Sequence, residues 1–327
     1  MVIFVNRAQH LLHRLGNKMT IRAIGTYLPD EVIDNLPICE SFGKDQKFLQ
    51  EKLGFLSRRQ KGASESVSDM CVRAVEDLES YMAFDRRRIG LLVVVTQNPE
   101  LKIPHTAAIL HQKLGLAAGC MTFDVSQGCA GYLHGLAIVD AVMRSQGIQE
   151  ALLLTCDPYS VIVDPTDLVT AMIFGDAATA TFLTLGGSGF QLADATFGTA
   201  QGSWKCLTCH DHFHMDGRQV LSNAIHEVPT AIRTLLDRRG LHISDIDLYA
   251  FHQASRHALE KLQEALDIDP AKAPFVAAHT GNTVSSSIPL MLKARVNAQS
   301  AGLILACGFG VGFSWGAGLL TLESRGN

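Results

Sequence analysis

The sequence lacks an excess of basic residues, since 28 lysines and arginines stand against 32 aspartates and glutamates, giving a net charge of −4. No basic footprint of the kind that binds nucleic acid is present. Charged residues are few, at 18%, whereas 47% of residues are hydrophobic and the mean hydropathy is +0.15. A chain of 327 residues with this composition is typical of a soluble globular protein with a large core, built as two domains or one layered unit.

Cysteines are too few and too scattered for a disulfide framework, with eight in the whole chain. Most of them stand in apolar or helical surroundings, where free cysteines usually pack. We therefore expect a reducing, cytoplasmic compartment. The apolar run at residues 1–5 is also too short for the core of a signal peptide.

A membrane span is not expected either, although residues 301–320 carry no charge and are long enough to cross a bilayer. This segment contains six glycines, which a spanning helix would carry at a high cost in stability. Two short strands joined by a glycine-rich turn fit the pattern better. The chain is thus predicted to interact with no membrane.

Short apolar runs alternate with amphipathic segments along the chain, which indicates an α/β fold. The predicted strands lie at 20–25, 90–95, 151–155, 174–182, 248–251 and 303–306, and the predicted helices at 68–83, 129–143, 223–239 and 256–266. The two halves resemble each other weakly. We predict an N-terminal extension at 1–18, a first half at 19–186 and a second half at 187–327, packed as one body.

Cys129 lies where a short strand meets a tight turn at Gly128 and an apolar helix follows. The unpaired N–H groups and the dipole of a helix start stabilise a thiolate and can also receive an oxyanion. A packed, inert cysteine is the ordinary alternative. The strand, turn and helix around Cys129 favour a nucleophile.

Two further polar residues stand at positions that suggest a role. His252 follows an apolar strand and precedes a helix, a place where α/β proteins put working side chains. Asn282 follows Gly281 and precedes small hydroxyl residues, which indicates a tight turn into a closely packed helix. Taken alone, His252 is more often a core histidine, and Asn282 is more often a helix cap.

Taken together, these segments resemble the ketoacyl synthase III branch of the thiolase superfamily over nearly the whole chain from Met19. The matching segments are Thr26–Pro29, Ile103–Ala108, Asp124–Ser126, Cys129–Gly131, Asp164–Asp167, Phe174–Asp176, Phe213–Gly217, His252–Ala254, Gly281–Thr283 and Gly310–Gly316. The resemblance implies a duplicated five-layered α-β-α-β-α sandwich that acts as a homodimer. It also implies a beta-ketoacyl-[acyl-carrier-protein] synthase activity.

In the family, a cysteine takes an acyl group from a thioester, and a malonyl thioester on acyl carrier protein then loses CO₂ and attacks that acyl group. Carried over to this chain, Cys129 is the nucleophile, and His252 and Asn282 stabilise the enolate by donating hydrogen bonds. The main-chain N–H groups of Cys129 and Val311 form the acyl oxyanion hole. The resemblance implies no cofactor, because acyl-CoA and malonyl carrier protein are substrates.

Several family positions are altered here. Val311 replaces a glycine, and the tryptophan and two arginines that grip CoA in the family become Phe48, Lys52 and Leu168. Ile103 stands where a large aromatic closes the acyl pocket from the partner subunit, which suggests a longer or branched acyl group. Two positions that the resemblance offers as contacts for the carrier protein are Arg256 and Lys261.

The sequence leaves two other functions open and disfavours several more. An acyltransferase could pass the Cys129 acyl group to an oxygen or nitrogen of a specialised metabolite, and a chain without activity could serve a heterodimeric synthase. A thiolase needs a second cysteine, but Cys307 lies one position early, and a one-residue shift turns a strand side chain to the other face. The head-to-head condensing relatives use a glutamate, but Glu100 does not align with the position of that glutamate, so this reaction is less expected. The Cys206–His214 cluster has the spacing of metal ligands, yet we expect a surface loop and no metal.

Overall fold

In the computed structural model, residues 18–168 and 170–323 are described. Within them, nine strands form one hydrogen-bonded sheet in the order β11-β12-β13-β8-β1-β7-β6-β4-β5. The strands of the first half occupy one end of this order and those of the second half the other. The two groups meet where β1 pairs with β8 over only two residue pairs, Thr20 with Gln191 and Ile21 with Phe190.

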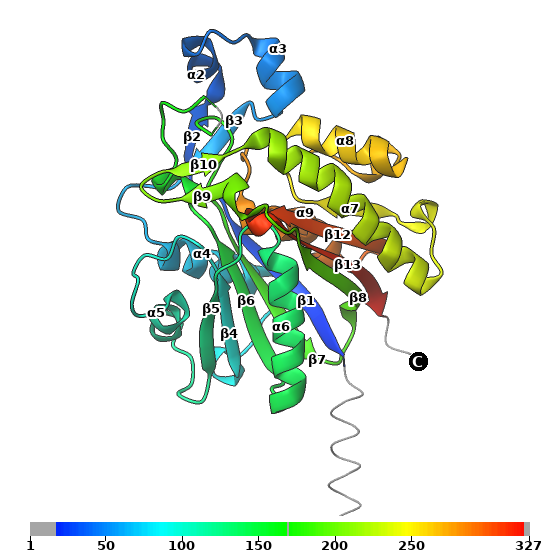
Figure 1. Cartoon of the computed structure of the whole chain (residues 1–327). Helices are drawn as coiled ribbons and strands as arrows, with labels where there is room; N and C mark the ends of the chain where they lie inside the picture. Colours follow the sequence, from blue (N-terminus) through cyan, green and yellow to red (C-terminus); the bar gives the residue numbers. More distant parts are fainter. Residues whose placement is uncertain (1–17, 169, 324–327) are drawn as a thin grey trace, which may run out of the picture.

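The first half contains five of these strands and the helices around them (Figure 1). Its sheet strands are β1 (Met19–Tyr27), β4 (Leu91–Val95), β5 (Met121–Val125), β6 (Glu150–Cys156) and β7 (Ala178–Leu185). Its helices are α2 (Asn35–Ser41), α3 (Gln46–Phe48), α4 (Val67–Tyr81), α5 (Thr106–Lys113) and α6 (Gly131–Gln146), with short turns η1 (Leu49–Leu53), η2 (Arg86–Arg88) and η3 (Tyr159–Val161). A small separate hairpin pairs β2 (Glu31–Asp34) with β3 (Ser57–Gln60).

The second half repeats the pattern with four sheet strands. These are β8 (Gly189–Thr199), β11 (Leu248–Phe251), β12 (Leu303–Gly310) and β13 (Ser314–Glu323). The helices are α7 (Gly217–Arg239), α8 (Arg256–Leu266) and α9 (Ser287–Asn297), with short turns η4 (Trp204–Cys206), η5 (Ile243–Asp245), η6 (Pro270–Lys272), η7 (Val284–Ser286) and η8 (Val311–Phe313). A second small hairpin pairs β9 (Leu207–Cys209) with β10 (Phe213–Met215).

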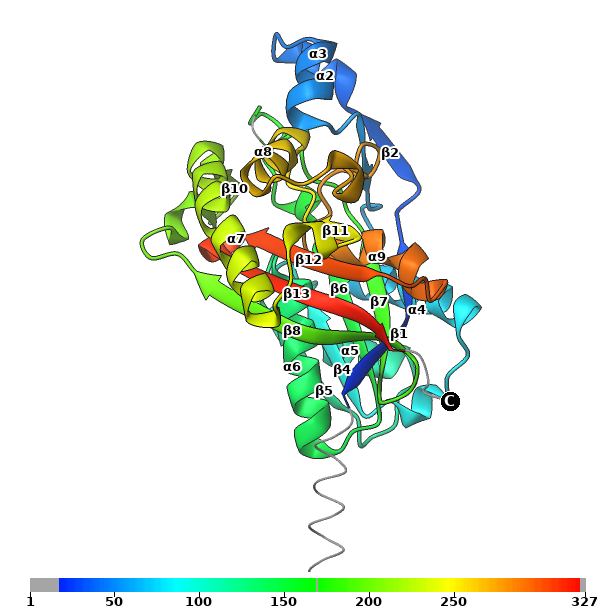
Figure 2. The same ribbon diagram turned by 90° about the vertical axis from the view of Figure 1, so that its right-hand side faces the viewer.

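Three apolar clusters separate the layers. One joins α4 and α5 to the outer face of the first group of strands, and another joins α7 and α8 to the outer face of the second group. The third contains α6 and α9 together with strand residues from both halves, so these helices form the middle layer (Figure 2). The predicted five-layered α-β-α-β-α arrangement is therefore confirmed. The exact domain bounds at residues 18 and 186 stay a prediction.

Side chains alternate between layers along β12, as a strand buried on both faces requires. Ile304 and Ala306 pack in the middle layer, whereas Leu305, Cys307 and Phe309 face α7 and α8. This alternation fixes which residues of β12 can reach the start of α6. It becomes decisive for the site described below.

Two predicted elements differ from the structure. The helix predicted at 223–239 begins earlier, at Gly217, because the Asp216 side chain accepts hydrogen bonds from the N–H groups of Arg218 and Gln219 and caps it there. The strand predicted at 174–182 begins only at Ala178, because Phe174 pairs with Asn282 in another loop. The predicted helix 256–266 and the strands around 91–95, 150–156 and 248–251 are confirmed.

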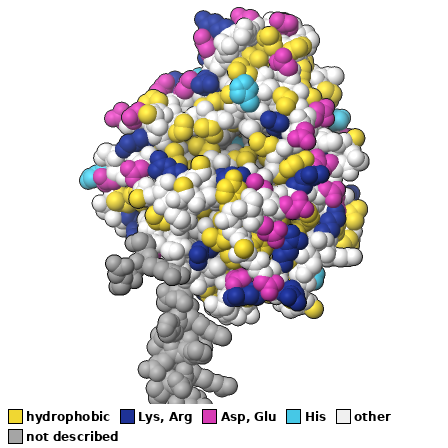
Figure 3. All heavy atoms as spheres, turned by 180° about the vertical axis from the view of Figure 1, so that it is seen from behind, with side chains coloured by type: hydrophobic (Ala, Val, Ile, Leu, Met, Phe, Trp, Pro, Cys, Tyr) yellow, Lys and Arg dark blue, Asp and Glu magenta, His cyan; other side chains and the backbone are white. Residues whose placement is uncertain are grey.

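The segment 301–320 forms β12, η8 and β13, as predicted. None of the described helices combines the length and the apolar character that crossing a membrane requires. On the face shown in Figure 3, basic and acidic side chains are interspersed. All eight cysteines are free thiols. The predicted extension at 1–18 lies outside the described residues, apart from Lys18.

Candidate active site

Cys129 lies in the turn between β5 and α6, two residues before the first residue of the helix. The turn closes through a hydrogen bond from the Gly131 N–H to the Gly128 carbonyl, at 2.7 Å. The Cys129 side chain is only 8% exposed and belongs to the apolar cluster under α7 and α8. The structure thus confirms the predicted strand, turn and helix around the candidate nucleophile.

Glycines of β12 make room for Cys129. A Cβ placed on Gly308 would lie 2.3 Å from the Cys129 carbonyl oxygen, and one on Gly310 would lie 2.9 Å from Cys129 Sγ. Both glycines therefore face the turn that carries Cys129, because alternate residues of a strand share a face. No side chain fits at either position without moving the nucleophile.

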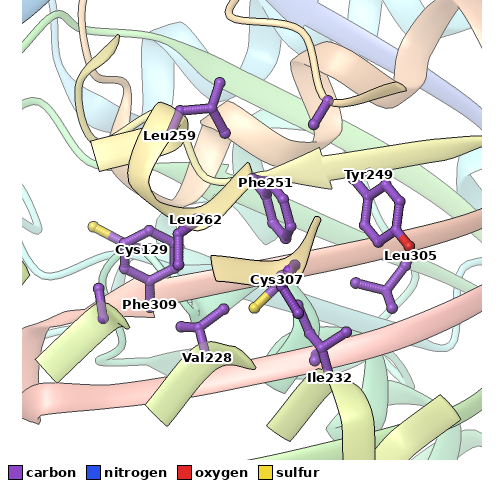
Figure 4. Packing of buried hydrophobic residues seen from close by; sticks show 14 of the residues in the cluster. Cys129, Val228, Ile232, Tyr249, Phe251, Leu259, Leu262, Leu305, Cys307 and Phe309 are labelled. Carbon is purple, nitrogen blue, oxygen red and sulfur yellow. The ribbon is translucent and has the colours of Figure 1, made fainter. Parts of the chain in front are cut away.

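Cys307 points away from this centre. It packs with Phe251, Val228 and Ile232 on the side of β12 that faces α7, as Figure 4 shows. A second cysteine on the side of Cys129 would have to stand at 308 or 310, where the chain has glycine. A thiolase mechanism with Cys307 as base is therefore excluded by the direction of its side chain.

His252 directly follows β11 and is 2% exposed. Its main-chain N–H donates to the Cys307 carbonyl oxygen at 2.8 Å, which anchors it to the neighbouring strand β12. Its Nδ1 lies 2.7 Å from Ser287 Oγ, and its Nε2 lies 3.4 Å from Asn282 Nδ2. Burial lowers the pKa of His252 to about 3, so the imidazole is neutral at physiological pH.

Asn282 is held by a close crossing of two loops. Its N–H donates to the Ile173 carbonyl and its carbonyl accepts from the Gly175 N–H, at 2.8 and 3.0 Å. A Cβ on Gly175 would lie 1.9 Å from the Thr280 carbonyl oxygen, so glycine is required there. The Asn282 Oδ1 accepts from the Val284 N–H at 2.9 Å, and its Nδ2 therefore faces His252.

The electrostatics of Cys129 differ from the sequence-based expectation. Burial, and then the negative charge of nearby Asp157, raise the pKa of the Cys129 thiol above its ordinary value. Both effects oppose the stabilisation of a thiolate that the helix start is predicted to provide. The thiolate therefore stays a prediction, which the pH dependence of Cys129 alkylation tests.

A buried polar network next to Cys129 was missed from the sequence. Asp157 is 1% exposed, and its carboxylate accepts from the Gln97 N–H at 2.6 Å and from Ser285 Oγ. Burial raises the pKa of Asp157 to about 6. The Tyr159 hydroxyl donates to Gln97 Oε1 at 2.8 Å, and the Tyr159 ring packs against Phe174 and Phe213. Asp157 directly follows β6, the same position after a strand that singled out His252.

Val311 is the first residue of η8, directly after the glycine that faces Cys129 Sγ. Its side chain packs over the nucleophile turn, with Cγ2 3.3 Å from a Cβ placed on Gly128. Its carbonyl accepts from Ser314 Oγ at 2.6 Å. The peptide between Gly310 and Val311 thus lies beside the nucleophile, and the oxyanion role of its N–H stays a prediction.

Ile103 lies in the loop between β4 and α5 and is 87% exposed. Because its side chain is exposed in a single chain, the predicted acyl-pocket role would need a second subunit and stays a prediction. Glu100, in the same loop, accepts from the Ser68 N–H at 2.9 Å at the start of α4. It is thereby explained as part of a helix cap.

Four residues predicted to contact the thioester or its carrier, Phe48, Lys52, Leu168 and Arg256, lie in two neighbouring places, which we together call the mouth. Lys52 and Arg256 line one groove of about 610 Å³, together with Gln50, Glu51, Leu56 and Glu260. Phe48 and Leu168 pack against a small apolar cluster of Cys39, Leu49 and Met172. The two cations of the groove are matched by two carboxylates, so the groove has no net positive charge.

Arg256 and Lys261 differ in how free they are to meet a partner. The Arg256 guanidinium stacks on Phe275 at 4.8 Å, and its Nε is buried without a hydrogen-bond partner. Lys261 Nζ is paired with Glu264 at 2.6 Å and does not line the groove. Arg256 is thus the better placed of the two predicted carrier contacts.

The Cys206–His214 cluster forms η4 and the β9–β10 hairpin. Cys206 is buried and Cys209 is exposed. In the described ranges, no three His, Cys, Asp or Glu side chains are grouped as metal ligands.

A buried cysteine packed against β12, with a buried histidine anchored to the same strand and paired with an asparagine, is the arrangement expected of a condensing enzyme of the thiolase fold. Comparison with known proteins narrows this class. Residues 123–201 match the family model described as 3-oxoacyl-[acyl-carrier-protein (ACP)] synthase III, and residues 236–322 match the model of its C-terminal part.

Relatives extend this similarity to nearly the full chain. The Beta-ketoacyl-[acyl-carrier-protein] synthase III of Hyphomonas neptunium is 30% identical over 324 residues, covering 94% of this chain and 100% of the relative. That of Rhodospirillum rubrum is 30% identical, with 93% and 99% covered. The crystal structure of 3-oxoacyl-(acyl carrier protein) synthase III, FabH from Pseudomonas aeruginosa PAO1, superposes with a TM-score of 0.86 at 27% identity, with 95% and 100% covered. The chain belongs to the beta-ketoacyl-[acyl-carrier-protein] synthase III family.

Proposed function

We propose that the protein condenses an acyl thioester with a malonyl thioester, the latter carried on acyl carrier protein, with loss of CO₂. The observation that carries this proposal is that the buried Cys129 lies against glycines of β12, and that the buried His252, anchored to the same strand, is paired with Asn282. It rests also on membership of a family of acyltransferases that form carbon–carbon bonds.

In the first step, Cys129 Sγ forms a bond to the acyl carbonyl carbon, the bond from that carbon to the donor sulfur breaks, and the donor leaves as a thiol that carries the proton lost by Cys129. The negative charge that develops on the acyl oxygen meets the main-chain N–H groups of Cys129 and Val311. In the second step, the bond between the malonyl carboxylate and its α-carbon breaks and releases CO₂. The enolate then attacks the acyl carbon, and Sγ leaves.

The residue types suit the second step. His252 and Asn282 are neutral and can both donate N–H groups to the malonyl thioester oxygen, on which the enolate charge develops. An ionised carboxylate in their place would repel the malonyl group. Both oxygens of the Asp157 carboxylate are occupied, one by the Gln97 N–H and the other by the Ser285 hydroxyl.

We further propose that the protein works as a homodimer through the edge of the sheet at β5. This strand ends the strand order, and an open strand edge can pair with another chain. Large apolar side chains near it are exposed: Met121 at 45%, Leu101 at 50% and Ile103 at 87%. Light scattering would test this proposal, with Ile103→Lys as the weakened variant; a monomeric wild-type protein would contradict it.

The remaining parts of the proposal concern substrates and place. The acyl donor is an acyl thioester, the reaction uses no cofactor, and the reaction takes place in the cytoplasm. Ile103 is smaller than the aromatic residue that closes the acyl pocket in the family, which favours a longer or branched acyl group. Mass spectrometry of Cys129 after incubation with a series of acyl-CoAs tests that preference, and labelling by acetyl-CoA alone would contradict it.

The deciding experiment incubates the enzyme with an acyl donor and malonyl carrier protein labelled at the free carboxylate. We expect labelled CO₂ and a 3-oxoacyl product. An acyltransferase that hands its acyl group to an oxygen or nitrogen would label Cys129 but release no CO₂. A non-catalytic partner subunit would do neither, and the Cys129, His252 and Asn282 set argues against it.

A further inference from the structure

The turn that carries Asn282 contains a strained valine. Val284 has a φ of 51°, in the left-handed region that β-branched residues avoid because Cβ crowds the backbone there. Its side chain is buried, and its N–H donates to Asn282 Oδ1 at 2.9 Å. Strained residues persist only where the surrounding structure holds them in place. The orientation of the Asn282 amide therefore depends on the contacts that keep this turn in its strained form.

The residue after Val284 is tied to the first half of the molecule through a buried carboxylate. Ser285 is fully buried, and its Oγ donates to Asp157 Oδ2, while Asp157 Oδ1 accepts from the Gln97 N–H. Asp157 directly follows β6 of the first half, whereas Ser285 belongs to η7 of the second half. A hydrogen bond to an ionised carboxylate is stronger than one between neutral groups. This contact therefore ties the strained turn firmly to the first half.

The next serine of the turn also contacts the first half, but only through neutral groups. Ser286 Oγ lies 2.8 Å from Thr155 Oγ1 and donates to the carbonyls of Thr155 and Ala177, at 3.2 and 3.3 Å. The charged partner of the turn is Asp157, which no step of the proposed reaction uses. A buried ionisable group of this kind, next to an active site, is a candidate for a functional role.

We propose that Asp157 is a positioning residue, which holds the strained turn through its hydrogen bond with Ser285 and thereby keeps the Asn282 amide directed at the malonyl thioester. This inference rests on the proposed function, because Asn282 is there taken to stabilise the enolate. Without the bond to the carboxylate, Val284 can relax to a negative φ. Its N–H then leaves Asn282 Oδ1, and the amide is free to rotate.

Two variants break this contact, and a third serves as a matched control. Ser285→Ala removes the hydroxyl, whereas Asp157→Asn removes the charge but keeps an oxygen that can accept from the Gln97 N–H. Thr20→Val removes another fully buried hydroxyl that joins the two halves. Thr20 Oγ1 accepts from Gln191 Nε2 at 3.4 Å, where β1 pairs with β8, and takes no part in the turn of Asn282.

The kinetic test separates the two half-reactions. We expect Ser285→Ala and Asp157→Asn each to release CO₂ about 10-fold more slowly at pH 8 and to acylate Cys129 at least about as fast as the wild type, because a misplaced group slows only the step that it serves. The double variant should lose no more than either single variant, because both changes break one contact. Losses that multiply, a parallel loss of acylation, or an equal loss in Thr20→Val would contradict the proposal.

The pH dependence distinguishes positioning by a charge from a merely structural role. Burial raises the pKa of Asp157 to about 6, so the wild type loses this charge as the pH falls through 6. The titratable groups that interact with Asp157 are Cys129, Cys156 and Tyr159, and the pKa of each is raised, so none ionises in this range. The advantage of the wild type over Asp157→Asn in CO₂ release should shrink from about 10-fold at pH 8 to about twofold at pH 5. A constant ratio would show that the charge plays no part.

Hydrogen exchange of the full-length protein, followed by NMR, tests the same contact without the reaction. We expect the Val284 N–H, which is bonded to Asn282 Oδ1, to exchange at least about 10-fold faster in Ser285→Ala and Asp157→Asn than in the wild type or Thr20→Val. Unchanged exchange of this N–H overturns the inference. If the wild type releases no CO₂, the proposed function fails, while the exchange of Val284 still decides whether Asp157 holds the turn.

Discussion

The catalytic centre and the mouth of the protein are built in different ways. Cys129, His252 and Asn282 are buried, and main-chain hydrogen bonds fix His252 to β12 and Asn282 to the loop at 173–175. Lys52 and Arg256 line an open groove, where charged side chains of both signs meet. The centre therefore tolerates almost no change, whereas the mouth can vary without disturbing the fold.

This difference explains where the chain departs from its family. The predicted substitutions at Phe48, Lys52 and Leu168 lie at or beside the groove, whereas Cys129, His252 and Asn282 are retained and Val311 is the one predicted substitution beside the nucleophile. A centre that depends on backbone crossings at Gly175 and Gly308 loses geometry with any added side chain. The predictions below test this contrast, beginning with the largest effect.

The largest effects should come from the centre itself. Cys129→Ala should abolish acyl labelling completely, because no other thiol lies at the site. His252→Ala should leave labelling intact and slow CO₂ release by about 10²–10³-fold, the range for loss of one transition-state donor. Intact-protein mass spectrometry and a CO₂ assay measure the two steps. A His252→Ala variant that cannot be acylated would contradict this division of roles.

A glycine outside the catalytic set should matter almost as much. Gly175→Ala places a Cβ 1.9 Å from the Thr280 carbonyl oxygen, so the loop that carries Asn282 must move. We expect a loss of about 3 kcal/mol in the free energy of unfolding and a severe loss of condensation. Gly119→Ala, which meets no atom within 4 Å, is the control. Denaturant unfolding and product formation check both, and equal stability of the two variants would refute the crossing argument.

Asp157→Asn should have an intermediate effect and reveal the buried charge. The folded-state pKa of Asp157, about 6, lies above the ordinary value of 3.8, so its ionisation costs stability as the pH rises from about 4 to about 6. We expect the variant to gain about 1–3 kcal/mol relative to wild type between pH 4 and pH 7. A stability difference that does not change with pH would contradict the prediction.

The same substitution should also change the nucleophile. Removing the negative charge of Asp157 should lower the pKa of the Cys129 thiol and speed its alkylation at pH 7 by several-fold, about one pKa unit at most. In the wild type, alkylation should keep rising with pH to at least about 9, because the thiol pKa is raised. An alkylation rate that stops rising near neutral pH would instead show that the helix start stabilises the Cys129 thiolate.

The smallest effects should come from the mouth. Lys52→Ala and Arg256→Ala should raise the KM for acyl-CoA or malonyl carrier protein by about two- to fivefold and weaken its salt dependence, with kcat nearly unchanged. Lys261→Ala should change less, because Lys261 is paired with Glu264. Lys205, which lies over Trp204 outside the groove, serves as control. A fall in kcat in the Lys52 variant would place that residue closer to the chemistry.

Much of the fold and the centre could be predicted from the sequence. Apolar runs and turn signals located most strands, and the resemblance of the motifs to the family predicted the nucleophile and its two partners. The predicted motifs also include residues whose role is to hold loops. Asp124 accepts from the N–H groups of Thr106 and Ala107 at the start of α5, and Asp176 accepts from the Lys61 N–H. A motif alone does not distinguish these roles.

The sequence by itself determined the α/β class and, through its resemblance, predicted the five layers and the three central residues. Only the tertiary structure decided the burial of Cys129 and the placing of Asp157 and Ser285 beside it. The physical reason is that pKa values and tautomers depend on burial and on neighbours distant in the chain, such as the 128 positions between Asp157 and Ser285. The direction of Cys307 likewise follows from which layers β12 separates, and no local pattern contains that information.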